Sequence, residues 1–110
     1  LSPVALQIAR QNAAAYQAPV DFLEANWLSA LRPNSIDLLV SNPPYIAITD
    51  KPGLQREVRD HEPELALFAG DDGLSAYRIL EQQAWDVLRP GGRIVFEIGS
   101  ILARELFTRW

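Results

Sequence analysis

The feature that most constrains the fold of this chain is a short apolar segment that is followed closely by two prolines. Residues 36–40 are mainly Ile, Leu and Val, and they are followed by Ser41-Asn42-Pro43-Pro44-Tyr45. This pattern predicts a buried strand over residues 36–40 that ends abruptly. Because ligands bind beyond the carboxyl ends of the strands in parallel α/β sheets, we expect the functional site in the residues that follow.

The residues after this strand, 42–45, predict a rigid polar loop, which we name the signature loop. Pro43 and Pro44 each fix their own φ and lack an N–H, so the carbonyls of Asn42 and Pro43 have few local donors. Asn42 adds an amide, and Tyr45 adds an aromatic face with a polar tip. The set suits a planar group that carries an NH2. A plain turn is the alternative, since Asn-Pro often begins one.

The signature loop resembles the Asn-Pro-Pro-Tyr motif of amino-group methyltransferases that use S-adenosylmethionine. Their acceptors are exocyclic amines of adenine or cytosine, or the side-chain amide of glutamine, and the tetrapeptide does not choose among them. Later motifs, in their order and spacing, resemble the HemK/PrmC-type methyltransferases that modify the glutamine of the Gly-Gly-Gln motif in peptide-chain release factors. These motifs are Glu62-Pro63, Ala66-Leu67, Gly70-Asp71-Asp72-Gly73-Leu74, Tyr77-Arg78, Pro90-Gly91-Gly92 and Glu97-Ile98-Gly99.

The resemblance implies an α/β fold, a Rossmann-like doubly wound methyltransferase sheet that is present here only in part. The first two strands and the last strands are missing, and with them the Gly-rich turn and the acidic residue that hold the cofactor in this family. Residues 1–110 would then be the C-terminal part of a catalytic domain in a longer protein. We expect an incomplete sheet with exposed edges, and an isolated segment that neither binds the cofactor normally nor is active.

The resemblance also assigns roles to individual residues. Asn42 would orient the target amide and abut the sulfonium end of the cofactor, and a carbonyl of the wall formed by Pro43 and Pro44 would accept a hydrogen bond from the target NH2. Tyr45 would stack on the glutamine amide. The predicted catalytic residues are Asn42, Pro43 and Tyr45, and the predicted substrate-binding residues are Asn42, Pro43, Pro44 and Tyr45.

Cofactor binding is expected to involve Asn26, Trp27 and Asn42. Trp27 resembles the aromatic residue that packs against adenine in this family. The residue before it is often Asp and holds the adenine amino group, whereas Asn26 offers a carbonyl acceptor instead. A core aromatic at a strand end is the alternative for Trp27.

Simpler structural roles compete with several of these assignments. Asn42 could cap a turn, and Tyr45 could be a half-buried aromatic beside the sheet. Glu97, at a strand end, is a candidate general base, although a structural carboxylate is the favoured interpretation. Asp71 and Asp72 are predicted helix caps, and His61, the single histidine of the chain, receives no catalytic role.

Hydrophobic periodicity predicts the remaining elements. Ser2 and Pro3 predict the start of a helix over residues 4–13, whose apolar stripe should pack on a sheet. Residues 46–68, which we name the flap, predict a polar functional loop or lid with one short helix over 54–59. The other expected elements are a strand over 19–24, a helical turn over 28–31, a helix over 73–88, a turn over 89–92, a strand over 93–98 and a helix from 100 to 110.

Composition narrows the functional class. The 110 residues suffice for one domain, and the net charge of -4 disfavours binding to a phosphate backbone. With no cysteine there is no disulfide or thiolate zinc site, and we expect no metal. No apolar run approaches the roughly 20 residues that span a bilayer, so a cytoplasmic enzyme without membrane contact is expected.

Two rival functions stay open beside glutamine methylation of a release factor. One is an N6-adenine or other amino methyltransferase that acts on nucleic acid, with a flipped base in the same slot. The other is a non-catalytic segment that recognises a partner protein through the flap. The oligomeric state, and which release factor would be the substrate, stay open as well.

Overall fold

The fold is mixed α/β, and a computed structural model describes residues 2–99, apart from the side chain of Arg59. The chain divides into two compact units, residues 1–31 and 32–110, which we describe separately. Across residues 2–99, none of the helices combines the length and the apolar character needed to cross a membrane. The helix predicted over 100–110 lies outside the described residues.

The first unit begins with the predicted helix, α1 (Pro3–Ala15). The Ser2 hydroxyl accepts a hydrogen bond from the Ala5 N–H at 3.2 Å, and Pro3 occupies the first turn, where its missing N–H costs nothing. No residue of α1 is buried. Ile8 and Tyr16, which belong to the stripe predicted to pack on a sheet, are exposed.

The strand predicted over residues 19–24 is wrong, because this part of the chain is irregular. A strand is stable only when neighbouring strands satisfy its backbone groups, and among the described residues no strand pairs with 19–24. The helical turn predicted over 28–31 is confirmed as a turn, in which the Leu31 N–H donates to the Leu28 carbonyl at 3.0 Å. Leu28 is buried there.

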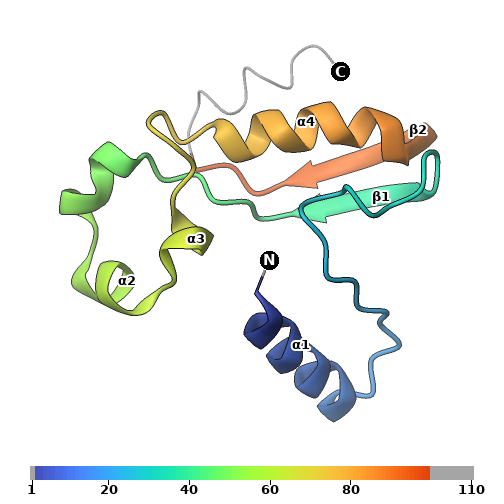
Figure 1. The fold of residues 1–110 in the computed structure, drawn as a ribbon, viewed down its shortest axis with the longest axis horizontal. Helices are drawn as coiled ribbons and strands as arrows, with labels where there is room; N and C mark the ends of the chain where they lie inside the picture. The colour runs from blue at the N-terminus through green and yellow to red at the C-terminus, as the bar shows by residue number, and fades with distance from the viewer. Residues whose placement is uncertain (1, 100–110) are drawn as a thin grey trace. The chain divides into compact units, whose positions relative to one another are not determined.

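The second unit is built on a strand, helix, strand succession (Figure 1). β1 (Ile36–Ser41) pairs in parallel with β2 (Leu88–Phe96), and α4 (Ser75–Val87) precedes β2. The predictions of a strand over 36–40 and a helix over 73–88 are confirmed within two residues at each end.

The turn predicted over residues 89–92 takes an unexpected form. Ile36 pairs with Leu88 and Leu38 pairs with Arg93, so extra residues of β2 bulge out of the ladder at that point. Gly91, with a φ of +81°, supplies the left-handed conformation that this bulge requires. β2 therefore begins before Pro90 and also ends at Phe96, two residues before the predicted end.

The core of the second unit lies between α4 and one face of the sheet. Tyr77 of α4 meets Phe96 of β2 edge to face, with ring centroids 5.9 Å apart. Strand alternation puts Leu39 and Ile94 on the same face as Phe96, and all three are half-buried. The buried residues of α4 recur at helical spacing: Ala76, Tyr77, Leu80, Ala84 and Val87.

The opposite face of the sheet carries exposed apolar side chains. Leu38, Val40 and Val95 are 55%, 66% and 53% exposed. Among the described residues the sheet has two strands, so each strand has one edge without a partner. That this pair of strands is part of a larger sheet stays a prediction.

The flap is more structured than predicted. It holds a 3₁₀ helix (Ile48–Gly53), α2 (Arg56–His61) and α3 (Glu64–Leu67), where one short helix over 54–59 was expected. Each piece is too short to be stable alone, so helical periodicity gives little signal. The two ends of the flap meet in a parallel bridge between Ile46 and Phe68.

The buried position of Leu80 generates a test of this core. Leu80 is 2% exposed, so Leu80→Ala should lower the free energy of unfolding by about 2–5 kcal/mol through lost burial and a cavity. Leu65→Ala is the matched control, because Leu65 is 71% exposed and its removal should cost much less. Denaturant unfolding of both variants measures the difference, and equal losses would contradict the packing of α4 described above.

Candidate active site

The carboxyl ends of β1 and β2 lie side by side at one edge of the sheet. Ser41 pairs with Phe96, and the Glu97 N–H donates to the Ser41 carbonyl at 3.0 Å. Because the strands are parallel, the signature loop and residues 97–99 leave the sheet at the same edge. This is the edge where ligands bind in open parallel sheets.

The signature loop combines an exposed polar side chain, Asn42, with a buried proline, Pro43. Pro43 is buried, Pro44 is half-buried and Asn42 is exposed. Within residues 2–99, the Asn42 side chain makes no hydrogen bond, and the carbonyls of Asn42 and Pro43 take no part in backbone hydrogen bonding. One side-chain amide and two backbone carbonyls are thus available to bind a ligand at this edge of the sheet. No hydrogen bond supports the alternative that Asn42 caps a turn.

Gly73 holds the far end of the signature loop. A Cβ atom at this position would lie 2.5 Å from the Tyr45 carbonyl oxygen and 3.3 Å from the Ala47 nitrogen. The φ of Gly73 is +72°, a conformation that other residues adopt only with strain. Periodicity predicts a helix that begins at Gly73, whereas α4 begins at Ser75, and the sequence holds no signal for this backbone contact.

Hydrogen bonds at the base of the flap fix the chain after Tyr45. The Ile46 N–H donates to the Leu67 carbonyl, the Ala69 N–H to the Ile46 carbonyl and the Ile48 N–H to the Gly70 carbonyl, each at 3.0 Å. The three bonds join the segment after the signature loop to the segment before α4. The position of the loop is therefore set by neighbours on both sides.

The Tyr45 ring lies against Gly99, beyond the end of β2. A Cβ atom at Gly99 would clash with the ring atom Cδ2, so the ring is in direct contact with the Gly99 backbone. Tyr45 also packs against the buried pair Leu74 and Tyr77. The ring is half-buried, and its position is the one described by the alternative reading of an aromatic beside the sheet.

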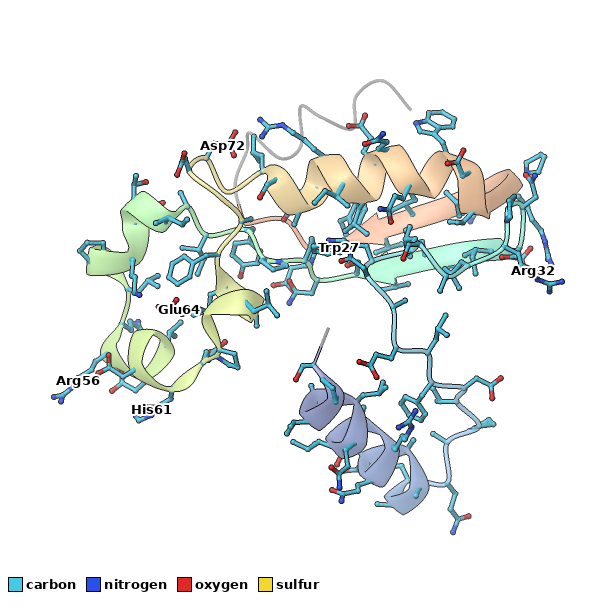
Figure 2. All side chains as sticks on the ribbon, in the orientation of Figure 1. Trp27, Arg32, Arg56, His61, Glu64 and Asp72 are labelled. Carbon is cyan, nitrogen blue, oxygen red and sulfur yellow. The ribbon has the colours of Figure 1, made fainter. Side chains whose placement is uncertain are left out.

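Asp72 shapes the turn before α4 (Figure 2). Its carboxylate accepts from the Leu74 N–H at 3.0 Å and from Nη2 of Arg78 at 2.6 Å. The hydrogen bond from Arg78, followed by that from the Leu74 backbone, lowers the pKa of Asp72 below its ordinary value of 3.8. The helix itself begins after Leu74, so Asp72 caps the preceding turn rather than α4.

The backbone of Glu97 has a clear structural role, whereas its side chain has none in the described structure. Its side chain is exposed, while its carbonyl accepts from the Tyr77 hydroxyl at 2.8 Å. His61 is exposed at the end of α2, on the flap and away from Asp72 (Figure 2). Residues 2–99 contain no group of His, Cys, Asp and Glu side chains that could hold a metal ion.

Asn26 and Trp27 belong to the first unit. Asn26 is exposed, and its carbonyl accepts from the Ser29 N–H at 3.2 Å. Trp27 is half-buried, with a φ of +54°, which is unusual for an aromatic residue and stores backbone strain. Such strain is found at binding sites more often than elsewhere, so Trp27 keeps its candidacy.

Comparisons with known proteins bear on this site. A family model described as "Methyltransferase small domain" matches residues 1–58, which include the signature loop. The release factor glutamine methyltransferase of Koribacter versatilis is 41% identical, over 100% of this chain and 41% of that protein. That of Moorella thermoacetica is 48% identical, over 91% of this chain and 36% of that protein.

A bifunctional methyltransferase of Rickettsia felis is 44% identical, over 86% of this chain and 18% of that protein. The chain thus spans about two fifths or less of the length of these three curated relatives. No solved structure matches the chain.

The contact between Gly73 and Tyr45 can be tested with a pair of glycine variants. Gly91→Ala introduces a side chain at positive φ into open space and should cost about 1–2 kcal/mol of unfolding free energy. Gly73→Ala adds a clash with the Tyr45 carbonyl to the same strain, so it should cost clearly more. Denaturant unfolding compares them, and an equal loss would show that the close approach is relieved at no cost.

The Asp72 carboxylate predicts a pH dependence. Because its pKa is lower in the folded protein than in the unfolded chain, it stabilises the fold above about pH 4, and this contribution is lost as the pH falls through the folded-state pKa. Asp72→Asn, which keeps an acceptor for Leu74, should lower the melting temperature at pH 7. This difference from wild type should shrink as the pH falls below about 4 and vanish only below the folded-state pKa of Asp72.

The exposed neighbour provides the control for this experiment, as Asp71→Asn should change the melting temperature less at pH 7. Asp72→Ala should be worse than Asp72→Asn at pH 7, since it also removes the acceptor for Leu74. A difference between Asp72→Asn and wild type that stays constant from pH 7 to pH 3 would refute the role given to the charge.

Proposed function

Because the chain belongs to the methyltransferase small domain family, we propose that the protein that carries it methylates a release factor. The methyl group passes from S-adenosylmethionine to the side-chain amide nitrogen of the glutamine in the Gly-Gly-Gln motif. The observation that carries this proposal is the 41–48% identity to release factor glutamine methyltransferases over 91–100% of this chain. The exposed amide of Asn42 at the edge of the sheet supports it.

We propose further that residues 1–110 are the C-terminal part of the catalytic domain, with a Rossmann-like doubly wound sheet. The parallel pair β1 and β2 with α4 before β2 is the repeating unit of such sheets. The strands expected before and after this unit would complete the sheet. A substrate of the translation machinery implies a cytoplasmic location.

The residues of this chain fit one part of an S-adenosylmethionine site. The exposed, unbonded amide of Asn42 provides donors and acceptors beside the buried Pro43, which suits a polar ligand against a rigid wall. In the first unit, Asn26 and Trp27 offer an acceptor and an aromatic face for adenine. The first glycine of the chain is Gly53, so a Gly-rich turn for the cofactor has to come from outside these residues.

Orientation of the acceptor amide is the main task of the signature loop in this mechanism. When bound, S-adenosylmethionine supplies a methyl group made electrophilic by its sulfonium. An amide nitrogen is a poor nucleophile because its lone pair is delocalised into the carbonyl. The Asn42 side chain and the Pro43 carbonyl accept hydrogen bonds from its two N–H groups, which raises electron density on nitrogen and aims the lone pair.

No titrating base is required beside the nitrogen, because the proton can leave after methyl transfer. Alignment of reacting groups is worth up to roughly 7–11 kcal/mol in favourable cases. That gain depends on a loop that does not move, and the contacts of Gly73 and the flap base supply the rigidity. Tyr45 keeps a partly exposed ring beside the amide acceptors.

Transfer of label from S-adenosylmethionine tests the proposal with the complete protein. The acceptors are a purified release factor, the same factor with its motif glutamine replaced, and total nucleic acid. We expect label on the intact factor alone, and Asn42→Ala should reduce the rate by about 10²–10³, the usual loss when one fixed hydrogen-bonding group is removed from a transition state. Gln82→Ala, which removes an exposed amide on α4, is the matched control and should keep the wild-type rate.

Other outcomes point to the rival functions. Label on nucleic acid would make the protein a base methyltransferase, which its net charge of -4 disfavours. Absence of label on any acceptor, together with absence of cofactor binding, would leave a non-catalytic segment that recognises a protein through the flap. Equal rates for Asn42→Ala and wild type would remove Asn42 from the site.

A further inference from the structure

Tyr77 is a buried polar residue that the mechanism above does not use. Its side chain is 0% exposed, and its hydroxyl donates to the Glu97 carbonyl at 2.8 Å. Burial raises the pKa of the phenol above its ordinary value of 10.0, and a hydrogen bond with the backbone of Gly99 lowers it in part. The hydroxyl therefore contacts the chain on both sides of Ile98, just beyond the end of β2.

The hydroxyl of Tyr77 is not needed to fill the core. A phenylalanine ring would occupy the same space against Phe96 and Leu74 and would bring no polar atom that has to be satisfied. What the hydroxyl adds is a fixed connection from α4 to residues 97–99, which continue β2 without a further strand partner in the described chain.

Residues 97–99 in turn support the signature loop. The Gly99 backbone touches the Tyr45 ring, and the same ring packs against Leu74 and Tyr77. The backbone of Gly73 packs closely against the Tyr45 carbonyl. A displacement of residues 97–99 would therefore move the ring of Tyr45 and, through it, the neighbouring prolines.

We propose that Tyr77 is a positioning residue for methyl transfer: its hydroxyl fixes residues 97–99, and these hold Tyr45 and the signature loop in the orientation that the acceptor amide requires. The inference rests on the proposed function for its kinetic consequence. The structural connection between Tyr77 and Tyr45 is independent of the proposed function. Two readouts, one kinetic and one structural, therefore test the proposal.

The kinetic readout uses Tyr77→Phe in the complete protein. We expect kcat for release factor methylation to fall about tenfold, because a small misplacement of aligned groups is costly, while the Kd for S-adenosylmethionine stays unchanged. Tyr16→Phe is the matched control, since Tyr16 is 84% exposed, and it should have the wild-type kcat. In the Asn42→Ala background, Tyr77→Phe should reduce kcat by less than twofold, because the group that it positions is gone.

The structural readout is amide hydrogen exchange, which needs no activity. Tyr77→Phe should speed exchange at Ile46, the hydrogen-bonded amide that follows Tyr45, and at residues 97–99 by tenfold or more, and it should leave exchange in the middle of α4 unchanged. Unchanged exchange at Ile46 would overturn the proposal, and so would a wild-type kcat in Tyr77→Phe. If the wild-type protein methylates no release factor, the proposed function fails, and the exchange result still decides whether Tyr77 holds the loop.

Discussion

The parallel ladder between β1 and β2 is the interaction on which the described structure of the second unit depends. It aligns the two carboxyl ends, so that the Glu97 N–H reaches the Ser41 carbonyl and two loops leave the sheet together. A parallel pair requires a crossover, and α4 lies before β2 and buries one face of the sheet. The location of the candidate site is thus a consequence of strand direction, before any side chain of the site is considered.

Rigidity of the signature loop comes from three different sources. The two prolines restrict φ within the loop, Gly73 allows a close backbone approach at its end, and Gly99 provides a flat surface for the Tyr45 ring. Both glycines allow these close contacts because they have no side chain. A site that works by orienting a weak nucleophile gains from such support, because the entropy of alignment is lost during folding rather than during each catalytic cycle.

The sequence predicted the elements that have a clear hydrophobic pattern and missed the contacts that join distant segments. The apolar run over residues 36–40 and the helical periodicity over 73–88 both correspond to elements of the structure. Residues 19–24 look like a strand, but a strand needs a neighbour for its backbone groups, and no strand of the described residues pairs with them. The contact of Tyr45 with Gly99 follows from strand register, which periodicity cannot specify, so the support of the signature loop could be described only from the structure.

The two ends of the flap are bonded to each other, so the residues between them are structurally separate from the sheet. Since the Ile46 and Phe68 segments are bonded to each other, the residues between them can change without altering the sheet. The entropy cost of closing such a loop grows only slowly with its length, so insertions or replacements there are tolerated. Residues 48–64 can therefore change in length and sequence while the pairing of β1 with β2, and the position of the signature loop after β1, stay the same.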